Sequence, residues 1–119
     1  MEFTTKDSGE REEYPTGMVR DLTDGKPRFD LIWPDRLDWE YQYLTRWAHL
    51  MARGAEKYGE RNWEKAATIQ EYLRFKESAF RHFMQWYHGA EDGEDHGVAV
   101  AFNIQAAEYV THRKPPFND

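Results

Sequence analysis

The chain has 119 residues, of which 39% are hydrophobic and 16% aromatic, and its formal net charge is −6. This length allows one small domain. The sequence contains no cysteine, which excludes a disulfide framework, a thiolate zinc site and a cysteine nucleophile. Basic residues are interspersed with acids, so we expect no binding to nucleic acid. No apolar run approaches a membrane span, and the first residues lack the apolar region of a signal peptide. We therefore expect no membrane contact, and the absence of cysteine is compatible with a reducing cytoplasm.

The first part of the chain is expected to lack regular structure. Residues 1–14 are polar and aperiodic, which is typical of an arm that is disordered or ordered only by a partner subunit. Residues 15–34 are rich in proline and glycine, and they predict an extended loop whose apolar end, LIW, packs on the helical body. Lys26 lies in the DGKPR turn, where it is either a solvated charge or a substrate contact. No segment alternates clearly enough to predict a strand.

A first helix is predicted to begin near Pro34, with Asp35 as its N-cap, and to end at Gly59. Its apolar face repeats at steps of four and three: Leu37, Tyr41, Leu44, Ala48, Met51 and Ala55. Residues 59–67 predict a connection or a short helical turn. Trp63 in this segment either covers the core or offers a surface on which a base can stack.

The second helix is predicted to begin at Thr68, because Glu71 three residues later completes a capping box. Gly89 ends it, and a third helix runs from about Asp95 to Thr111. The second helix carries the apolar stripe Ile69, Leu73, Phe80, Phe83 and Tyr87, widened by Tyr72, Phe75, Ala79 and Trp86, so we expect it to be buried over much of its surface. The third helix repeats Ala99, Phe102, Ala106 and Tyr109. We therefore expect one all-α domain over residues 15–113 and a short tail over residues 114–119.

The corner between these two helices is strongly acidic, since four of the five residues 91–95 are aspartate or glutamate. Capping and the helix dipole explain one or two such carboxylates, at about 0.3–1 kcal/mol each. Four of them repel one another unless a cation lies among them, and residues 82–112 contain no lysine or arginine. The cation is therefore Arg81 or Lys57 from elsewhere in the fold, or a metal ion.

Several polar residues of the two helices have both a structural and a chemical interpretation. Glu77 either pairs with Arg81 on the helix surface or faces the third helix as a metal ligand. His82 and His96 are either hydrogen-bonded packing residues or groups that bind phosphate or orient a carboxylate. Asn103 follows His96 by seven residues and shares its face, where it makes a helix–helix hydrogen bond or recognises a base or sugar. No nucleophile elbow, P-loop or dinucleotide motif occurs, so a hydrolase here would use a metal-activated water.

Four segments, DGKPRFDLI, RGAEKYGERNWEKA, EYLRFKESAFRHFMQW and EDHGVAVAFN, occur in this order. Together they resemble the N-terminal-type dATP/dGTP diphosphohydrolase family, found mainly in bacteriophages and related to the all-α MazG-like nucleotide pyrophosphohydrolases. The best-known members of that family, the MazZ enzymes, occur in phages that replace adenine by 2-aminoadenine. The resemblance covers about residues 17–110, and its most specific parts are GA-x-KYG-x-x-NW-x-K, E-x-x-x-RH at 77–82, and EDH at 94–96 with Asn103.

This resemblance implies a MazG-like helical bundle that assembles as a homodimer or homotetramer in the cytoplasm of an infected host. It implies hydrolysis of dATP or dGTP to the monophosphate and pyrophosphate, with two or three Mg²⁺ or Mn²⁺ ions. The implied metal ligands are Glu77, Asp92, Glu94 and Asp95. The implied catalytic residues are Lys57, Arg81 and His82. The implied substrate contacts are Lys26, Asn62, Trp63, Lys65, His96 and Asn103.

The sequence departs from the MazG-like pattern, in which the ligands follow E-x-x-E and then E-x-x-D. Arg74 stands three residues before Glu77, and the second pair is Asp92 with Asp95. Glu56 on the first helix is a further potential ligand. Two other functions stay open. An HD-type phosphohydrolase needs adjacent His-Asp, whereas this chain has the reverse order at Asp95-His96. A non-enzymatic module that binds a protein would leave the acidic corner as a solvated surface.

Overall fold

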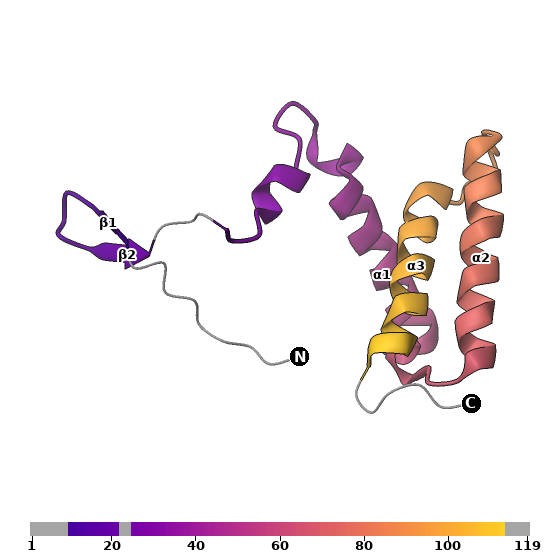
Figure 1. The fold of residues 1–119 in the computed structure, drawn as a ribbon. Coiled ribbons are helices and arrows are strands. Elements are labelled where there is room, and N and C mark those ends of the chain that lie inside the picture. The colour runs from indigo at the N-terminus through magenta and orange to yellow at the C-terminus, as the bar shows by residue number, and fades with distance from the viewer. Residues whose placement is uncertain (1–9, 22–24, 114–119) are drawn as a thin grey trace. The chain divides into compact units, whose positions relative to one another are not determined.

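A computed structural model describes residues 10–21 and 25–113 (Figure 1). The chain forms two compact units, residues 1–32 and residues 33–119. The described residues are mostly helical, as predicted, with the addition of one small two-stranded sheet. Among them, no helix combines the length and apolar character needed to cross a bilayer. Most of the arm predicted at residues 1–14, and the tail predicted at 114–119, lie outside the described residues.

The first unit contains an antiparallel hairpin of β1 (Arg11–Glu13) and β2 (Val19–Asp21) (Figure 1). Arg11 lies opposite Asp21, and their side chains form an ion pair of 2.6 Å. The Gly17 N–H donates to the Tyr14 carbonyl at 2.8 Å, and Gly17 takes a φ of +88° that glycine adopts without strain. The prediction that this region holds no strand was wrong. Strands of three residues are too short for an alternating pattern to be recognised.

A short 3₁₀ helix, η1 (Phe29–Ile32), follows in the same unit. Leu31 and Ile32 of the predicted apolar run belong to this unit, so the expectation that they pack on the helical body stays a prediction. Trp33, the first residue of the second unit, is half-buried, with its ring 5.4 Å from that of Trp39. Trp33 is thus partly covered within the helical unit.

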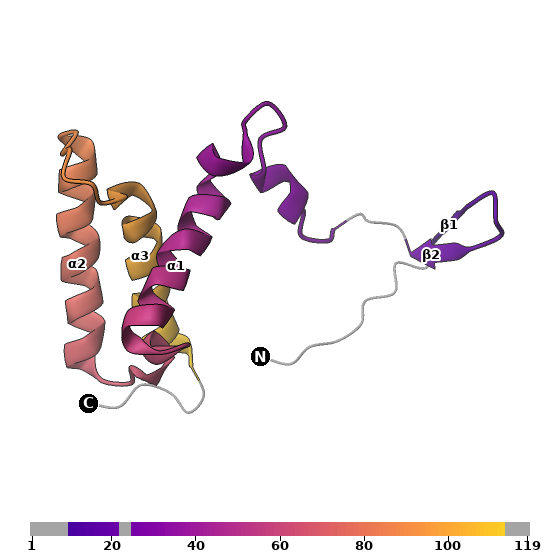
Figure 2. The ribbon, with the colours of Figure 1, turned by 180° about the vertical axis from the view of Figure 1, so that it is seen from behind.

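The second unit consists of η2 (Trp39–Tyr41), α1 (Tyr43–Tyr58), η3 (Asn62–Lys65), α2 (Ile69–Tyr87) and α3 (His96–His112). Helix α3 lies between α1 and α2 and packs on both of them (Figures 1 and 2). A short corner joins α2 to α3, so these two helices run antiparallel. The turn predicted within residues 59–67 is η3. It is tied to α3 by the Tyr109 hydroxyl, which donates to the Glu64 carbonyl at 2.9 Å.

Helix α1 begins seven residues later than predicted, with Gln42 rather than Asp35 as its N-cap and Tyr43 as its first residue. Gln42 is fully buried in an extended conformation, and its side-chain amide donates to the carbonyls of Pro34 at 2.7 Å and Leu37 at 2.8 Å. These two hydrogen bonds hold the preceding segment as a compact loop, because they satisfy carbonyls that would otherwise belong to a helical turn. The apolar repeat that predicted the first helix therefore includes residues of this loop, Leu37 and Tyr41, as well as residues of the helix.

Helix α2 begins where it was predicted, with Thr68 as its N-cap. The Glu71 N–H donates to the Thr68 hydroxyl at 3.2 Å, and the Glu71 carboxylate accepts from the Thr68 N–H at 3.1 Å. The capping box is thus complete. The predicted end is also confirmed, since the helix stops at Tyr87 and Gly89 takes a φ of +72°.

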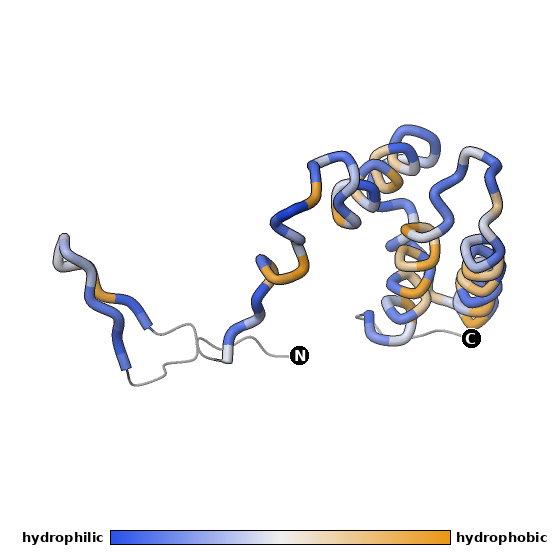
Figure 3. The backbone as a smooth tube through the Cα atoms, turned by 90° about the horizontal axis from the view of Figure 1, so that it is seen from above, coloured by the Kyte–Doolittle hydropathy of each residue, from blue (hydrophilic) through white to orange (hydrophobic). Residues whose placement is uncertain are grey.

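The hydrophobic core is small and centred on α3. Its buried apolar residues are Ala66, Val98, Ala99, Ala106, Ala107 and Val110. Hydrophobic residues recur along α2 and α3, whereas the hairpin shows only a short hydrophobic stretch (Figure 3). The predicted stripe of α2 does not enter this core, since its five members Ile69, Leu73, Phe80, Phe83 and Tyr87 are all exposed. The predicted apolar face of α1 is likewise exposed at Leu37, Tyr41, Leu44 and Ala48.

Replacing Gln42 by Ala should lower the free energy of unfolding by about 2 kcal/mol, because two buried hydrogen bonds are lost at about 1 kcal/mol each. Urea unfolding at fixed protein concentration measures this. Gln70→Ala, at an exposed position of the first turn of α2, serves as the control and should change stability by less than about 0.5 kcal/mol. Equal effects of the two variants would show that Gln42 does not hold the loop.

Candidate functional site

The corner between α2 and α3 brings three potential ligands of a metal ion together. One ligand atom each from Asp92, Glu94 and His96 lies within 4.8 Å of the other two. Gly93 adopts a φ of +82° in a bend of the chain between Asp92 and Glu94. Asp95 caps α3 by accepting from the Val98 N–H at 3.4 Å, at the point where this helix was predicted to begin. Within the acidic run, Asp95 therefore caps α3, whereas Asp92 and Glu94 belong to the group of potential metal ligands.

His96 is buried beneath this corner and has a partner at each ring nitrogen. Its Nε2 lies 2.9 Å from both carboxylate oxygens of Asp92, and its Nδ1 lies 2.8 Å from Nδ1 of His82 on α2. A hydrogen bond from the Glu94 N–H, followed by the one from His96, lowers the pKa of Asp92. Asp92 is thus an ionised acceptor at neutral pH, so Nε2 of His96 carries the hydrogen.

His82 is half-buried in α2. Desolvation, followed by the nearby charge of Arg81, lowers the pKa of the His82 imidazole, so this ring is uncharged at neutral pH. Its Nε2 makes no hydrogen bond to any residue of the described ranges 10–21 and 25–113. The two histidines were interpreted as packing residues or as chemical groups, and the structure joins them into a single hydrogen-bonded chain that ends at Asp92.

The cation that neutralises Asp95 is Arg46 of α1. The guanidinium donates to both carboxylate oxygens, from Nε at 2.8 Å and from Nη2 at 2.9 Å. These hydrogen bonds lower the pKa of Asp95 and raise that of Arg46. The partner of Asp95 is therefore neither Arg81 nor Lys57, which were the two side chains considered from the sequence.

Further contacts hold α1 close to the start of α3. The Tyr43 hydroxyl donates to the Gly97 carbonyl at 2.6 Å. A Cβ atom at Gly97 would lie 3.4 Å from Nη2 of Arg46 and 3.5 Å from Cδ1 of Trp86. Both are ordinary van der Waals distances, so side chains of α1 and α2 lie against the same turn of α3 without requiring glycine at this position.

A cavity of about 880 Å³ lies between α1, η3, α2 and α3. Glu94 and Asp95 line its wall at the acidic corner. The α1 side is basic, because Arg46, Arg53 and Lys57 are spaced by seven and four residues and so share one face of the helix. Aromatic and amide side chains line it away from the corner, namely Tyr58, Asn62, Trp63, Phe75, Phe102 and Asn103.

Seven of the residues singled out from the sequence line this cavity: Lys57, Asn62, Trp63, His82, Glu94, Asp95 and Asn103. Trp63 is half-buried, with its ring 5.8 Å from that of Phe102 and 5.1 Å from that of Tyr109, so it covers the core and also lines the cavity. The Asn103 amide donates to the Ala99 carbonyl at 2.8 Å within its own helix. The helix–helix hydrogen bond considered for Asn103 is therefore not the one formed.

Other residues singled out from the sequence lie elsewhere. Asp92 and His96 adjoin the cavity through the corner but do not line it, and Lys65 and Glu56 are exposed away from it. Arg81 is exposed and donates to the Gln85 side chain at 3.3 Å. Lys26 is exposed in the first unit.

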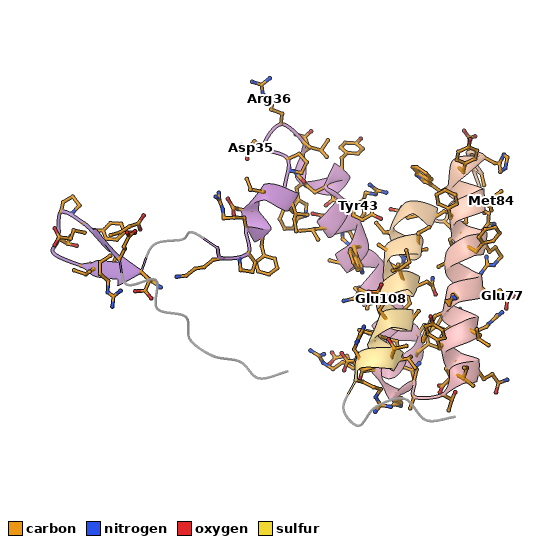
Figure 4. All side chains as sticks on the ribbon, in the orientation of Figure 1. Asp35, Arg36, Tyr43, Glu77, Met84 and Glu108 are labelled. Atoms are coloured by element: carbon orange, nitrogen blue, oxygen red, sulfur yellow. The ribbon has the colours of Figure 1, made fainter. Side chains whose placement is uncertain are left out.

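Glu77 lies on the side of α2 that faces away from α3 (Figure 4). The Glu77 side chain is 72% exposed, and its carboxylate lies 3.5 Å from the Arg74 guanidinium, so its ion-pair partner is Arg74 and not Arg81. The ring of Phe75 lies 6.3 Å from that of Phe102 on α3, and two residues along a helix turn a side chain by about 200°. Within one copy of the chain, Glu77 therefore does not join the acidic corner.

The basic side of the cavity was largely missed from the sequence, because only Lys57 of its residues was singled out. Arg46, Arg53 and Arg61 also line it. The spacing of Arg46, Arg53 and Lys57 on one helical face was a signal that could have revealed them. Arg61 lies after the helix with a left-handed φ of 58°, and no periodicity predicts its position.

A family model described as dATP/dGTP diphosphohydrolase, N-terminal, matches residues 16–119. The chain belongs to this family. The resemblance read from the sequence motifs is thereby confirmed. The name of the family is that of a diphosphohydrolase of dATP and dGTP, and the part it describes is an N-terminal domain. No curated protein and no solved structure matches the chain.

Replacing Asp95 by Asn should lower the free energy of unfolding at pH 7 by about 1–2 kcal/mol, because the partly exposed ion pair with Arg46 is weakened. The pKa of Asp95 is lowered in the folded state, so its contribution is present above the unfolded value of about 3.9. It is lost as the pH falls through the lower folded value. Urea unfolding of both proteins at about pH 7 and about pH 3 should show the difference shrinking in acid.

Asp38→Asn is the matched control, since Asp38 precedes η2 without a side-chain capping hydrogen bond. The free energy of unfolding of this variant should equal that of the unsubstituted protein at both pH values. A stability difference for Asp95→Asn that is the same at neutral and acidic pH would contradict an electrostatic role for Asp95.

Proposed function

We propose that the protein hydrolyses purine deoxynucleoside triphosphates, dGTP or dATP, to the monophosphate and pyrophosphate with the help of divalent metal ions. The observation that carries this proposal is the cavity, which joins an acidic corner to a row of basic side chains. A triphosphate and a metal ion need both kinds of charge next to each other. Membership of the dATP/dGTP diphosphohydrolase family supports the same substrate class.

The corner fits a hard divalent cation. Asp92 and Glu94 offer oxygen atoms within a 4.8 Å group, and Asp95 adds a third carboxylate beside them on the cavity wall. His96 already donates from Nε2 to Asp92, so in this arrangement it orients a carboxylate instead of binding the ion itself. We propose Asp92 and Glu94 as the principal ligands. A bound Mg²⁺ or Mn²⁺ supplies positive charge to the triphosphate and acts as a Lewis acid.

The residues of α1 and η3 suit the remaining parts of the nucleotide. Arg53, Lys57 and Arg61 line the cavity and supply positive charge to phosphate oxygens. Trp63 offers an aromatic surface to a purine base, and the amide groups of Asn62 and Asn103 offer hydrogen bonds to base or sugar. From Arg46 to Tyr58, α1 extends over about 18 Å at 1.5 Å per residue, which is enough for an extended nucleotide.

Incubation with dGTP and dATP in the presence of Mn²⁺ should release pyrophosphate and the corresponding monophosphate, resolved by ion-exchange chromatography. dCTP and dTTP should react more slowly. Orthophosphate or intact triphosphate as the product would show that this cavity serves another reaction. No turnover, together with no thermal shift on adding Mn²⁺, would favour a protein-binding module.

Matched glutamine variants separate the two groups of acids in the same assay. Glu94→Gln should lower kcat/KM about 100-fold or more, because a ligand of the ion in the cavity is lost. Glu77→Gln changes an exposed carboxylate on the side of α2 that faces away from α3. If one copy of the chain forms the whole site, this variant should keep kcat/KM within about 3-fold of the unsubstituted protein. A loss in Glu77→Gln alone would instead assign Glu77 to a site completed by a second copy.

We also propose that the protein assembles as a homodimer or homotetramer through the α2 stripe, defined by Ile69, Leu73, Phe80, Phe83 and Tyr87. These side chains are 42–69% exposed, while no aromatic side chain of the described residues belongs to the buried core. A continuous apolar face of this kind is typical of an interaction surface. A second copy offers the same face, and an isologous contact would cover both.

Phe80→Glu should reduce the mass measured by light scattering after gel filtration to that of a smaller species, because a buried carboxylate at the contact is unfavourable. Arg74→Glu lies on the hydrophilic side of α2 and should keep the original mass. A monomeric unsubstituted protein at micromolar concentration would rule out this assembly.

A further inference from the structure

One polar side chain that lines the cavity is held in a fixed orientation by its own helix. The Nδ2 atom of Asn103 donates to the Ala99 carbonyl at 2.8 Å. A carbonyl oxygen can only accept, so the amide atom that faces Ala99 is the nitrogen, because the reverse orientation would place two oxygen atoms against each other. Asn103 is 8% exposed, and close packing restricts the rotation of its amide. The amide oxygen, Oδ1, is therefore held in one place on the other branch of the side chain.

This oxygen is available to a ligand. No N–H or O–H group of the described residues 10–21 and 25–113 donates to Oδ1 of Asn103. The buried side-chain oxygens of these residues that lack both a partner and contact with solvent are Oε1 of Gln42 and Oγ1 of Thr45. Oδ1 of Asn103 is therefore accessible to solvent, and Asn103 lines the cavity. A molecule in the cavity thus meets a fixed hydrogen-bond acceptor.

The position of this acceptor suits the base of a nucleotide better than its sugar. Asn103 lies seven residues beyond His96 at the acidic corner, which is a rise of about 10 Å along α3. If the α-phosphate lies at the corner, the 3′-hydroxyl of the sugar extends only about 6 Å from the phosphorus at bond lengths near 1.5 Å. The base extends further. The aromatic rings of Trp63, Phe75 and Phe102 line the same cavity and offer surfaces on which a base can pack.

We propose that Oδ1 of Asn103 selects the base of the nucleotide by accepting a hydrogen bond from an N–H group on the Watson–Crick edge of the base. The inference rests on the proposed function, because that function places a purine nucleotide in the cavity. Guanine carries such donors at N1 and at its 2-amino group, adenine carries one at its 6-amino group, and unsubstituted purine carries none. A base without a donor leaves the oxygen of Asn103 without a partner, which weakens binding.

Isothermal titration with 2′-deoxynucleoside 5′-monophosphates measures this selection without metal and without turnover. The bases compared are guanine, hypoxanthine, adenine, 2-aminopurine and unsubstituted purine. The monophosphate of unsubstituted purine should bind about 10- to 100-fold more weakly than the tightest of the other four. Which base restores binding identifies the donor, since hypoxanthine carries only the N1 hydrogen and 2-aminopurine only the 2-amino group. Equal affinities for all five, or no binding of any of them, would overturn the inference.

Asn103→Leu keeps a side chain of similar size but removes the acceptor. Its affinity for the tightest of the five monophosphates should fall to that for unsubstituted purine, while its affinity for unsubstituted purine should stay within about 3-fold of that of the unsubstituted protein. Gln105→Leu, at an exposed position of α3 outside the cavity, is the control and should keep the full selection. An equal loss for all five monophosphates in Asn103→Leu would assign the oxygen to the sugar or the phosphate and overturn the inference.

The outcomes separate this inference from the proposed function. Donor-dependent binding of the monophosphates, without hydrolysis of any deoxynucleoside triphosphate, would uphold the role of Asn103 and overturn the proposed function. Hydrolysis of dGTP or dATP, with affinities that do not depend on the donors of the base, would uphold the function and overturn the inference. If Asn103→Leu fails to fold, the five affinities of the unsubstituted protein still decide.

Discussion

The arrangement of the helices around the cavity depends on the ion pair between Arg46 on α1 and Asp95 at the start of α3, which joins residues 49 positions apart. The same carboxylate caps α3 through the Val98 N–H, so it determines both where α3 begins and how closely α1 approaches. Thr45 is the only buried residue of α1. Polar contacts, more than hydrophobic burial, therefore hold α1 in place. Because α1 forms one wall of the cavity, the same contacts set the shape of the cavity.

The ion pair also changes how the acidic corner is understood. Asp95 is neutralised by Arg46, and Asp92 is held by His96, so both carboxylates have protein partners. Glu94 is the most exposed of the three, at 61%, and it lines the cavity. The repulsion that suggested a metal from the sequence is thus partly relieved within the fold. A metal site at this corner is therefore supported more by the charged side chains that line the cavity than by the crowding of four carboxylates in residues 91–95.

Local interactions made part of the structure predictable. The capping box at Thr68, the end of α2 near Gly89 and the start of α3 near Asp95 were all predicted correctly, since each involves residues within a few positions of one another. Periodicity was less reliable. It identified the α2 stripe correctly as a single face but assigned it to the core, because an apolar pattern does not say whether its partner is the same chain or another copy.

The sequence by itself therefore determined the helical class, most helix ends, the family and the acidic composition of the corner, because these follow from neighbouring residues and from motifs in order. Only the tertiary structure decided that α1 begins after Gln42, that Glu77 faces away from α3, and that His82 meets His96. The last contact joins residues 14 positions apart across a corner whose geometry depends on Gly89 and Gly93. Helix rotation and packing set such contacts, and a pattern along one chain does not contain them.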